Sequence, residues 1–402
     1  MSRKISIGIT ISLVITAITI TFAITMSVSQ RTYNRLITDL PERTQMYSSI
    51  AKIDELVRSN YYGKISEKVL NEKVAGGYVA GLGDAYSKYM TADEYADYVT
   101  VISGKSLGIG VTTTLNEANG YMTVTQVFSG SPAENSGLKK GDEITQIGGE
   151  PISAKNYEEM LKSFEGQNLS SVDITFKRET ETKTVSVVVG YNLPSVSHRL
   201  IGDVGYIRIT AFYENTAIQV SNAIHSLIES EAKSLIFDVR NTDKGSVEYA
   251  AQVIDLLVPV ASEGTGALAS AVDKNGQTVK VFSSNSTDVS LQMVVLVNSK
   301  TCGGAELFAC DLRDFGKAWI VGNTTKGNGT MQEVFRLDDG GAVMLTVAKI
   351  LPYKSDSFDG VGVVPDYESS LTFSQKSNFD LLEDEEDTQL QTALTLLSGN
   401  DE

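Results

Sequence analysis

Strands and helices alternate along the second half of the chain, and this alternation limits the possible folds more than any other feature. Apolar runs at Gly205–Ile209 and Ser234–Val239 are predicted strands, and a helix is predicted between them over Thr216–Glu229. A further helix is predicted over Val247–Leu257. Because strands that alternate with helices build a sheet covered by helices, the pattern predicts an α/β domain over residues 191–370.

The region before this domain has short strands separated by glycine-rich turns. Pro132 and Gly137 bracket a compact helical turn, since proline is favoured at a helix start and glycine at its end. Tyr157–Phe164 is predicted to be an amphipathic helix. The predicted strands are Tyr121–Phe128, Asp142–Ile147, Val172–Lys177 and Thr184–Val189. Together these elements predict a separate β-rich domain over residues 101–190.

Arg3 and Lys4 lie near the N-terminus, and the run Ile5–Val28 that follows them contains no charged residue. Such a run can cross a bilayer, so residues 1–30 are predicted to be a signal anchor, a transmembrane helix that is not cleaved. The positive charges before the span predict a cytoplasmic N-terminus in a single-pass protein of the cell membrane, with the bulk of the chain extracytoplasmic. The alternative is a cleaved signal peptide, which would make the protein secreted.

Residues 31–100 are predicted to form a polar stalk and an N-terminal helical module. Ile50–Asn60 carries apolar residues at helical spacing. Thr91 is placed to cap the next helix, with Glu94 at the reciprocal position of a capping box. We interpret this module as scaffold rather than as a source of reactive groups.

The charge of the chain argues against one broad class of partner. The net charge is −16, so a general basic surface is absent and no nucleic acid is expected to bind. Much of this charge is local, because every charged residue from Asp380 to Glu402 is acidic. This composition predicts a solvated acidic C-terminal tail over residues 371–402, in which Leu381–Leu397 has enough Leu and Ala for a short helix.

Cysteine and histidine usage predicts neither a disulfide framework nor a metal site. Cys302 and Cys310 are the two cysteines, and a helix between them would hold them too far apart to form a bond. The two histidines, His198 and His225, lie in unrelated contexts. With so few potential ligands, no metal and no cofactor are predicted.

The segment from Val294 to Gln332 carries the most specific motif of the chain. Its strand Val294–Val297 is followed by Asn298 and by Glu306 at the start of a helix, and then by Gly322, Thr325, Gly327, Gly329 and Gln332. This arrangement resembles the catalytic core of the carboxyl-terminal processing peptidases, also called tail-specific proteases. The resemblance implies an α+β multidomain protein with a PDZ domain and an α/β protease-like core of crotonase-like ββα units.

Two further stretches support the PDZ part of this resemblance. Leu107-Gly-Ile-Gly-Val111 and the later segment GSPAENSGLKKGDEITQIGGEPI resemble a PDZ domain. Such a domain captures an extended peptide as an added strand and holds its terminal carboxylate on backbone N–H groups. The resemblance therefore implies that protein or peptide C-termini are the partners, and that the peptide-binding loop consists of Leu107, Gly108, Ile109, Gly110 and Val111.

The family uses a catalytic serine and a lysine base, and this chain has neither at the matching positions. The gapless match places Gly303 at the serine position and Asn328 at the lysine position. Gln332, which helps to orient the lysine in the family, is retained. The segment FDVRNTDKGSV resembles the loop whose backbone binds the oxyanion, which implies an oxyanion region of Lys244, Gly245 and Gly304. Lys244 replaces a glycine there, so a strained backbone is expected at this position.

Glycine supplies no nucleophile and asparagine is almost non-basic, so the sequence predicts a pseudoprotease. It would bind C-termini or unfolded peptide outside the cytoplasm as an adaptor, a decoy or a partner of an active homologous protease. The alternative is an active serine-type endopeptidase that cleaves near substrate C-termini with an unconventional nucleophile, either Thr301 with Lys326 as its base or Cys302. A purely structural surface protein is a third reading.

Overall fold

A computed structural model describes residues 16, 18–22, 24–27, 40–105, 107–164, 171–259, 267–284 and 289–399. The chain divides into two compact units, Met1–Asn71 and Glu72–Glu402. The predicted membrane helix over residues 1–30 falls largely outside the described residues. Among the described helices, none is both long enough and apolar enough to span a bilayer.

The predicted helical module is present. Its helices are α2 (Leu40–Asn60), α3 (Glu67–Ala80), which crosses the boundary between the units, and α4 (Ala92–Ile102). Thr91 caps α4 in the expected capping box, in which the Thr91 side chain and the Glu94 side chain each bond the backbone of the other residue. Within the second unit, the short strand β1 (Lys88–Met90) precedes α4 and belongs to a sheet of the core described below.

The β-rich domain is an antiparallel sheet whose strands follow the order β3-β4-β5-β7-β8, with β6 paired to β5. Its sheet face is covered by two short helices, and its buried side chains form one core that includes Met122, Ile144 and Phe176. The strands are β2 (Leu107–Gly108), β3 (Val111–Leu115), β4 (Met122–Val127), β5 (Glu143–Ile147), β6 (Glu150–Pro151), β7 (Ser171–Arg178), β8 (Glu181–Val188) and β9 (Tyr191–Asn192), and the helices are α5 (Pro132–Asn135) and α6 (Tyr157–Lys162).

The α/β domain is centred on a six-stranded sheet of order β10-β11-β12-β15-β16-β19. All its neighbouring strands run parallel except β10 and β11. The predicted helix Thr216–Glu229 is confirmed as α7. The strands are β10 (Val196–Ile201), β11 (Val204–Ile209), β12 (Ser234–Asp238), β15 (Gln292–Val297), β16 (Ala318–Gly322) and β19 (Tyr367–Glu368), and the other helices are α8 (Val247–Asp255) and α9 (Gly304–Asp314).

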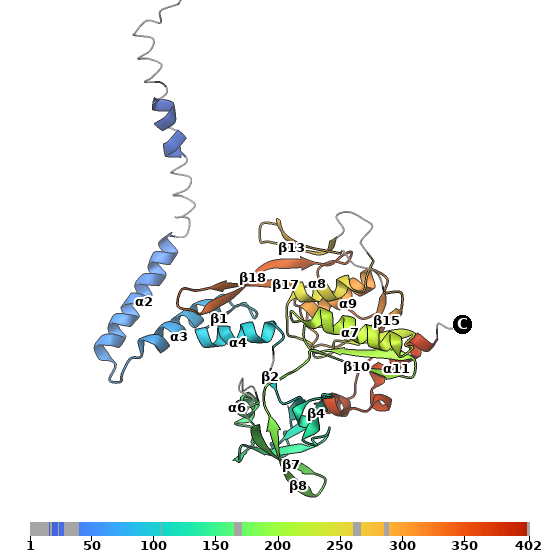
Figure 1. Ribbon diagram of the computed structural model, residues 1–402. Coiled ribbons are helices and arrows are strands. Elements are labelled where there is room, and N and C mark those ends of the chain that lie inside the picture. Colours follow the sequence, from blue (N-terminus) through green and yellow to red (C-terminus); the bar gives the residue numbers. More distant parts are fainter. Residues whose placement is uncertain are drawn as a thin grey trace, which may run out of the picture. The chain divides into compact units, whose positions relative to one another are not determined.

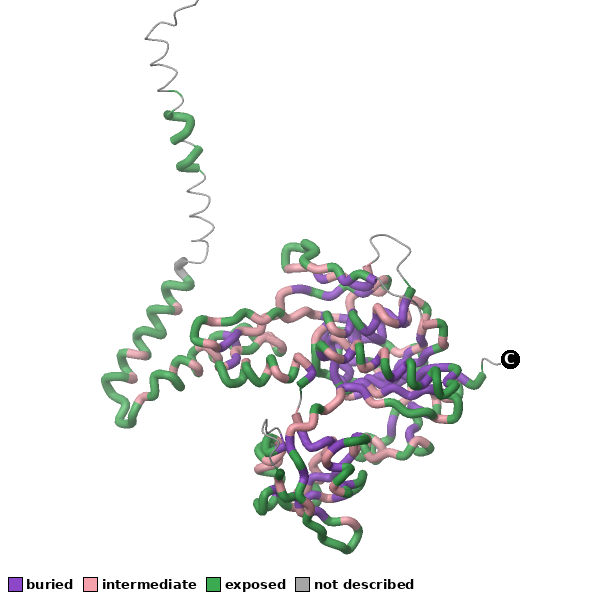
Figure 2. The backbone as a smooth tube through the Cα atoms, in the orientation of Figure 1, coloured by how far each residue is buried: buried purple, intermediate pink, exposed green. Residues whose placement is uncertain are grey.

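Side chains alternate between the two faces of this sheet, as the pleat of a strand requires. Met293, Val295 and Val297 of β15 pack in the core formed with α7, α8 and α9. Val294 and Leu296 of the same strand pack in a second core with the C-terminal helix α11 (Thr388–Ser398). The central sheet is therefore buried on both faces, which is typical of parallel sheets (Figures 1 and 2).

The core contains a second sheet, in which all paired strands run antiparallel. Its order is β1-β18-β13-β14, and β17 pairs with β18. Its longest strand, β18, pairs with β1, β13 and β17. The bounds are β13 (Ala267–Val272), β14 (Thr278–Ser283), β17 (Thr330–Arg336) and β18 (Ala342–Leu351).

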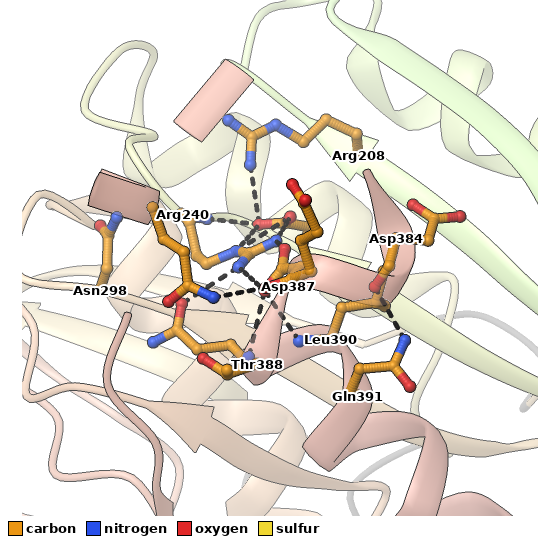
Figure 3. A network of polar contacts seen from close by, with 12 residues as sticks. Arg208, Arg240, Asn298, Asp384, Asp387, Thr388, Leu390 and Gln391 are labelled. Atoms are coloured by element: carbon orange, nitrogen blue, oxygen red, sulfur yellow. Dashed lines mark hydrogen bonds and ion pairs between the residues drawn. The ribbon is translucent and has the colours of Figure 1, made fainter. Parts of the chain in front are cut away.

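The prediction of a solvated acidic tail is wrong for the part of residues 371–402 that the structure describes. Leu390, Ala393 and Leu397 of α11 are buried against the central sheet. At the start of α11, Asp387 pairs with the buried guanidinium of Arg240, with an Nη2–Oδ2 distance of 2.7 Å (Figure 3). The tail segment also includes α10 (Phe373–Ser377) and the 3-10 turns η1 (Phe379–Leu381) and η2 (Asp384–Glu386). The acidic composition of this segment predicted a solvated tail, although one face of α11 is apolar.

Candidate functional site

One cavity of about 1020 Å³ collects nearly all the candidate residues of the α/β domain. Its walls also include parts of α4, β14, β17 and β18. Thr301 is not among the lining residues and is fully buried. The candidate residues that line the cavity are Lys244, Gly245, Cys302, Gly303, Gly304, Lys326, Asn328 and Gln332.

The structure brings Gly303 and Asn328 face to face. Gly303 is the N-cap of α9 and has a φ of 63°, a left-handed backbone that non-glycine residues rarely adopt. A Cβ built on Gly303 would lie 3.4 Å from Nδ2 of Asn328, which is ordinary van der Waals contact, and would meet no other neighbour within 4 Å. A side chain at 303 would thus point at the side chain at 328, the geometry that a nucleophile and its base need.

Glu306 holds the two positions in place. Its carboxylate is fully buried in the first turn of α9. Oε2 accepts from the backbone amides of Gly303 (2.9 Å) and Asn328 (2.8 Å). Oε1 accepts from the amide of Gly327 (2.6 Å) and from the Thr325 hydroxyl. Four donors to one carboxylate tie the helix start to the loop before β17, so the relative position of 303 and 328 depends on Glu306.

Asn328 lies at the end of a chain of side-chain hydrogen bonds. Nε2 of Gln332 donates to the hydroxyl of Thr330 (2.8 Å), and this hydroxyl donates to Oδ1 of Asn328 (2.7 Å). Gln332 also donates to the Thr346 hydroxyl at 3.3 Å. The retained Gln332 therefore still has hydrogen-bond partners. Through Thr330 it orients Asn328, the asparagine that occupies the lysine position.

The oxyanion region keeps its backbone shape. Gly245 has a φ of 109°, and a Cβ there would lie 2.1 Å from the carbonyl oxygen of Phe212, so a side chain is excluded. The backbone strain expected at Lys244 is not found, since Lys244 does not have a positive φ. In this loop the non-glycine residue with a positive φ is Asn241, with a φ of 58°. Within the part of the chain that the structure describes, the amides of Gly245 and Gly304 donate no hydrogen bond and remain available.

Cys302 is a weak nucleophile in this setting, because its pKa is raised. Its side chain is buried, with 7% of the residue exposed. Burial raises the pKa of the Cys302 thiol, the Glu306 carboxylate raises it further, and the lowering effects of Lys326, Asn328 and Tyr86 do not offset them. Because the thiolate is the nucleophile, a raised pKa argues against Cys302 as a replacement for the missing serine.

The geometry also argues against Thr301 and Lys326 as a shifted dyad. The Thr301 hydroxyl donates to the carbonyl oxygen of Val239 at 2.9 Å and accepts from the amide of Asn298 at 3.0 Å. Lys326 is exposed, and its Nζ lies 5.8 Å from the centroid of the Tyr86 ring. The threonine is a structural residue that closes a turn, and it does not share the cavity with the lysine.

Sequence reasoning missed two residues of the site. Tyr86 was interpreted as scaffold, yet it lines the cavity and its hydroxyl approaches the Cys302 sulfur. Burial raises the pKa of Tyr86 to about 12, and the neighbouring Cys302 adds to the effect. Glu306 was recognised only as the start of a helix. The sequence signal for the buried role of Glu306 is its place as an acidic residue among the apolar residues of α9. For Tyr86 the sequence offers no such signal, because no spacing connects it to Cys302.

The peptide-binding loop of the β-rich domain lies apart from the cavity. β2 pairs with β9, and the carbonyl groups of Ile109 and Gly110 accept from the amides of Ala133 (3.0 Å) and Phe128 (2.9 Å). β3 is an edge strand of its sheet. The Tyr157 hydroxyl at the start of α6 donates to the Thr113 carbonyl oxygen of β3 at 3.3 Å. The open side of β3 thus faces α6, which leaves a strand edge where a peptide can add.

Comparisons with known proteins agree with this architecture. The description Peptidase family S41 matches residues 203–369, and a PDZ domain matches residues 106–189. A CtpA-like serine protease of Staphylococcus aureus is 28% identical over 361 residues, which cover 89% of this chain and 71% of the relative. The carboxy-terminal processing protease CtpA of Bacillus subtilis is 28% identical over 337 residues, with 81% and 69% covered.

A solved structure shows the same fold. It is an S41 protease from Bacteroides fragilis, with a TM-score of 0.58 and 19% identity, and the match covers 85% of this chain and 92% of the other. At this level of identity the likeness concerns the arrangement of helices and strands alone.

Proposed function

We propose that this chain, which belongs to the carboxyl-terminal processing peptidase family, is a pseudoprotease that binds protein C-termini or unfolded peptide through its PDZ domain. One observation carries the proposal. A Cβ added at Gly303 would lie 3.4 Å from Nδ2 of Asn328, where a nucleophile and its base would stand, and neither residue can perform that role. A backbone glycine has no reacting atom, and a carboxamide is almost non-basic.

The surrounding groups do not replace the missing pair. Thr301 is bonded to the backbone and fully buried. The raised pKa of Cys302 keeps the thiol protonated near neutral pH, and the histidines of the chain, His198 and His225, do not line the cavity. The site still has the backbone amides of the oxyanion region and a cavity with space for a peptide. These features support binding of a peptide without its cleavage.

Peptide capture by the PDZ domain is the second part of the proposal. The open edge of β3 offers main-chain partners to an added strand, and the loop Leu107–Val111 offers the backbone amides that would receive a terminal carboxylate. The run Ile5–Val28 supports a location at the cell membrane, with the bulk of the chain outside the cytoplasm. There the protein would act as an adaptor or a decoy, or as a partner of an active homologue.

Two measurements on the purified full chain test this function. We expect no cleavage of casein, and we expect peptides with a free C-terminus to bind more tightly than the same peptides with a C-terminal amide. Cleavage that is abolished by Thr301→Ala or by Cys302→Ala would instead establish an active endopeptidase with an unconventional nucleophile. Equal and negligible binding of both peptides would remove peptide capture and favour a structural role.

A further inference from the structure

An acidic segment in front of α11 takes no part in the site described above. Five of the eight residues 379–386 are acidic and none is basic. A run of like charges is usually a solvated surface, but two neighbours in this run pair with two different domains. Oε1 of Glu383 lies 3.4 Å from Nζ of Lys140 in the PDZ domain. Asp384 pairs with Arg199 of β10, in the core. The segment therefore bridges the two domains.

The same segment covers the outer face of the PDZ sheet. Met122 and Val124 of β4 pack in the core of the domain. Because side chains alternate along a strand, Thr123 and Thr125 point to the opposite face. That face of an antiparallel sheet is commonly solvated, yet each threonine is only 7% exposed. The 3-10 turn η1, which opens the acidic segment, contacts β4. The segment therefore shields β4 from solvent.

The attachment of the segment to the core is the stronger of its two attachments. The ring of Phe379 lies against the guanidinium groups of Arg208 and Arg240, whose Cζ atoms are 5.2 and 4.7 Å from the ring centroid. These distances are in the range of cation–π attraction. By contrast, the pair of Lys140 and Glu383 is exposed on both sides. Exposed ion pairs contribute little to stability and weaken with salt, so the attachment to the PDZ domain is the one that opens first.

The segment also borders the groove at which a peptide would add. The Tyr157 hydroxyl donates to the Thr113 carbonyl oxygen on the open edge of β3. Burial raises the pKa of Tyr157, and the carboxylates of Glu158 and Asp380 raise it further, while the bond to Thr113 lowers it. Asp380 belongs to η1, so a residue of the acidic segment lies close enough to the groove for its charge to act there.

We propose that residues 379–386 form a strap that docks the PDZ domain on the core and can be released on the PDZ side. Phe379 and Asp384 hold the strap to the core, whereas Glu383 and the contact with β4 hold the PDZ domain to the strap. While the strap is docked, a peptide held by the PDZ loop is presented to the cavity from one direction. Release would free the PDZ domain to turn about the chain connections at its two ends. The docking itself does not depend on the proposed function.

Thr123→Cys provides a reporter of docking. The full chain with this substitution is treated with methyl methanethiosulfonate, a small uncharged thiol reagent, and modification at position 123 is followed by mass spectrometry. Cys302 and Cys310 are buried and lie far along the chain, so their peptides are distinguished by mass. Adding Glu383→Lys should speed the modification at 123 about threefold, because it removes an exposed ion pair and brings a like charge to Lys140.

Salt should act on the same attachment. Raising the NaCl concentration from about 0.05 to about 0.5 M should speed the modification when the strap is unaltered, because it screens an attraction. It should slow the modification in Glu383→Lys, where it screens a repulsion from Lys140. The same response to salt in both chains would contradict the assignment of this ion pair to the strap.

Two matched variants tie the effect to the ion pair. Lys140→Glu combined with Glu383→Lys restores the pair with its charges exchanged, and should return the modification rate to that of the unaltered strap. Glu385→Lys makes the same change of charge two positions further along and should leave the rate unchanged, because Glu385 is exposed and pairs with no residue that the structure describes. Equal acceleration by Glu383→Lys and Glu385→Lys, or no return in the exchanged pair, would overturn the strap.

Hydrogen exchange of chains without the added cysteine gives an independent measurement. The amides of η1 should exchange faster in Glu383→Lys than in the unaltered chain, because β4 covers this turn for less of the time. The amides of β15 in the central sheet should exchange equally in both chains, which shows that the fold is intact. Equal exchange of η1 in the two chains would overturn the proposal even if Thr123→Cys did not fold. Peptide binding and casein cleavage test the proposed function separately, so the two proposals can fail independently.

Discussion

Glu306 and the Gly303/Asn328 pair adjoin each other in the core, yet they differ in what they still provide. The Glu306 carboxylate has four donors and connects the start of α9 to the loop before β17. The pair that it holds together has neither a nucleophile nor a base. The comparison shows that the hydrogen bonds of Glu306, which hold the site in shape, contribute to the stability of the fold. Peptide cleavage would require in addition a nucleophilic side chain at 303 and a basic side chain at 328, and the fold needs neither.

A second buried cluster, made of charged side chains, also holds the core together. Arg240 donates to both Asp238 and Asp387, and its side chain is 2% exposed (Figure 3). Burial alone would raise the pKa of Asp238, but the adjacent Arg208 and Arg240 hold it well below its usual range. Because Asp238 and Arg240 precede the oxyanion loop, this cluster fastens the C-terminal helix to that loop.

The largest effect is expected from Arg240→Met. The substitution leaves the carboxylates of Asp238 and Asp387 buried without their cation, which should lower the free energy of unfolding by about 3–5 kcal/mol. Urea denaturation of the full chain measures it, with Arg336→Met on the exposed part of β17 as the control. A loss no larger than that of the control would mean that α11 is not fastened by this cluster.

Glu306→Gln should have the next largest effect. The amide keeps one acceptor oxygen but turns an N–H group towards backbone donors, so a loss of about 2–4 kcal/mol in the free energy of unfolding is expected. The exposed substitution Glu368→Gln is the matched control in the same denaturation experiment. If the two variants were equally stable, Glu306 would not be the residue that holds positions 303 and 328.

Gly303→Ala tests whether the space for a side chain is intact. The φ of 63° and ψ of −116° at Gly303 are a strained combination for a residue with a side chain, so alanine there should reduce stability by about 1–3 kcal/mol. Gly130→Ala is the control, because Gly130 has a φ of 72° and a Cβ there would meet nothing within 4 Å. We expect the loss at 303 to stay within this range, since the Cβ at 303 meets Asn328 only at ordinary contact distance. A much larger loss at 303 would mean that the nucleophile position is closed.

Lys326→Met should give the smallest effect. The Lys326 charge lowers the pKa of the Cys302 thiol, although burial and Glu306 raise it more. Removing that charge raises the pKa further and reduces the thiolate fraction, so modification by methyl methanethiosulfonate at pH 8 should slow by about twofold. The variant Lys354→Met, outside the cavity wall, should leave the rate unchanged. A faster reaction would show that Lys326 does not stabilise the thiolate.

Much of the fold followed from local pattern. The alternation of apolar strands and helices placed α7 over its observed residues, and the motif spacing placed Gly303 and Asn328 in one site. Docking of α11 did not follow, because the acidic residues before Leu390, Ala393 and Leu397 dominated the composition of that segment. The link between Tyr86 and Cys302 joins residues far apart in the chain, and such contacts leave no periodic signal in either segment.

The most direct test of the central claim restores the two missing side chains. The full chain carrying Gly303→Ser and Asn328→Lys is compared with the unaltered chain for cleavage of casein. The account predicts that the double variant cleaves casein while the unaltered chain does not, because the frame already holds the two positions in contact. Cleavage by the unaltered chain, or no cleavage by a stably folded double variant, would contradict it.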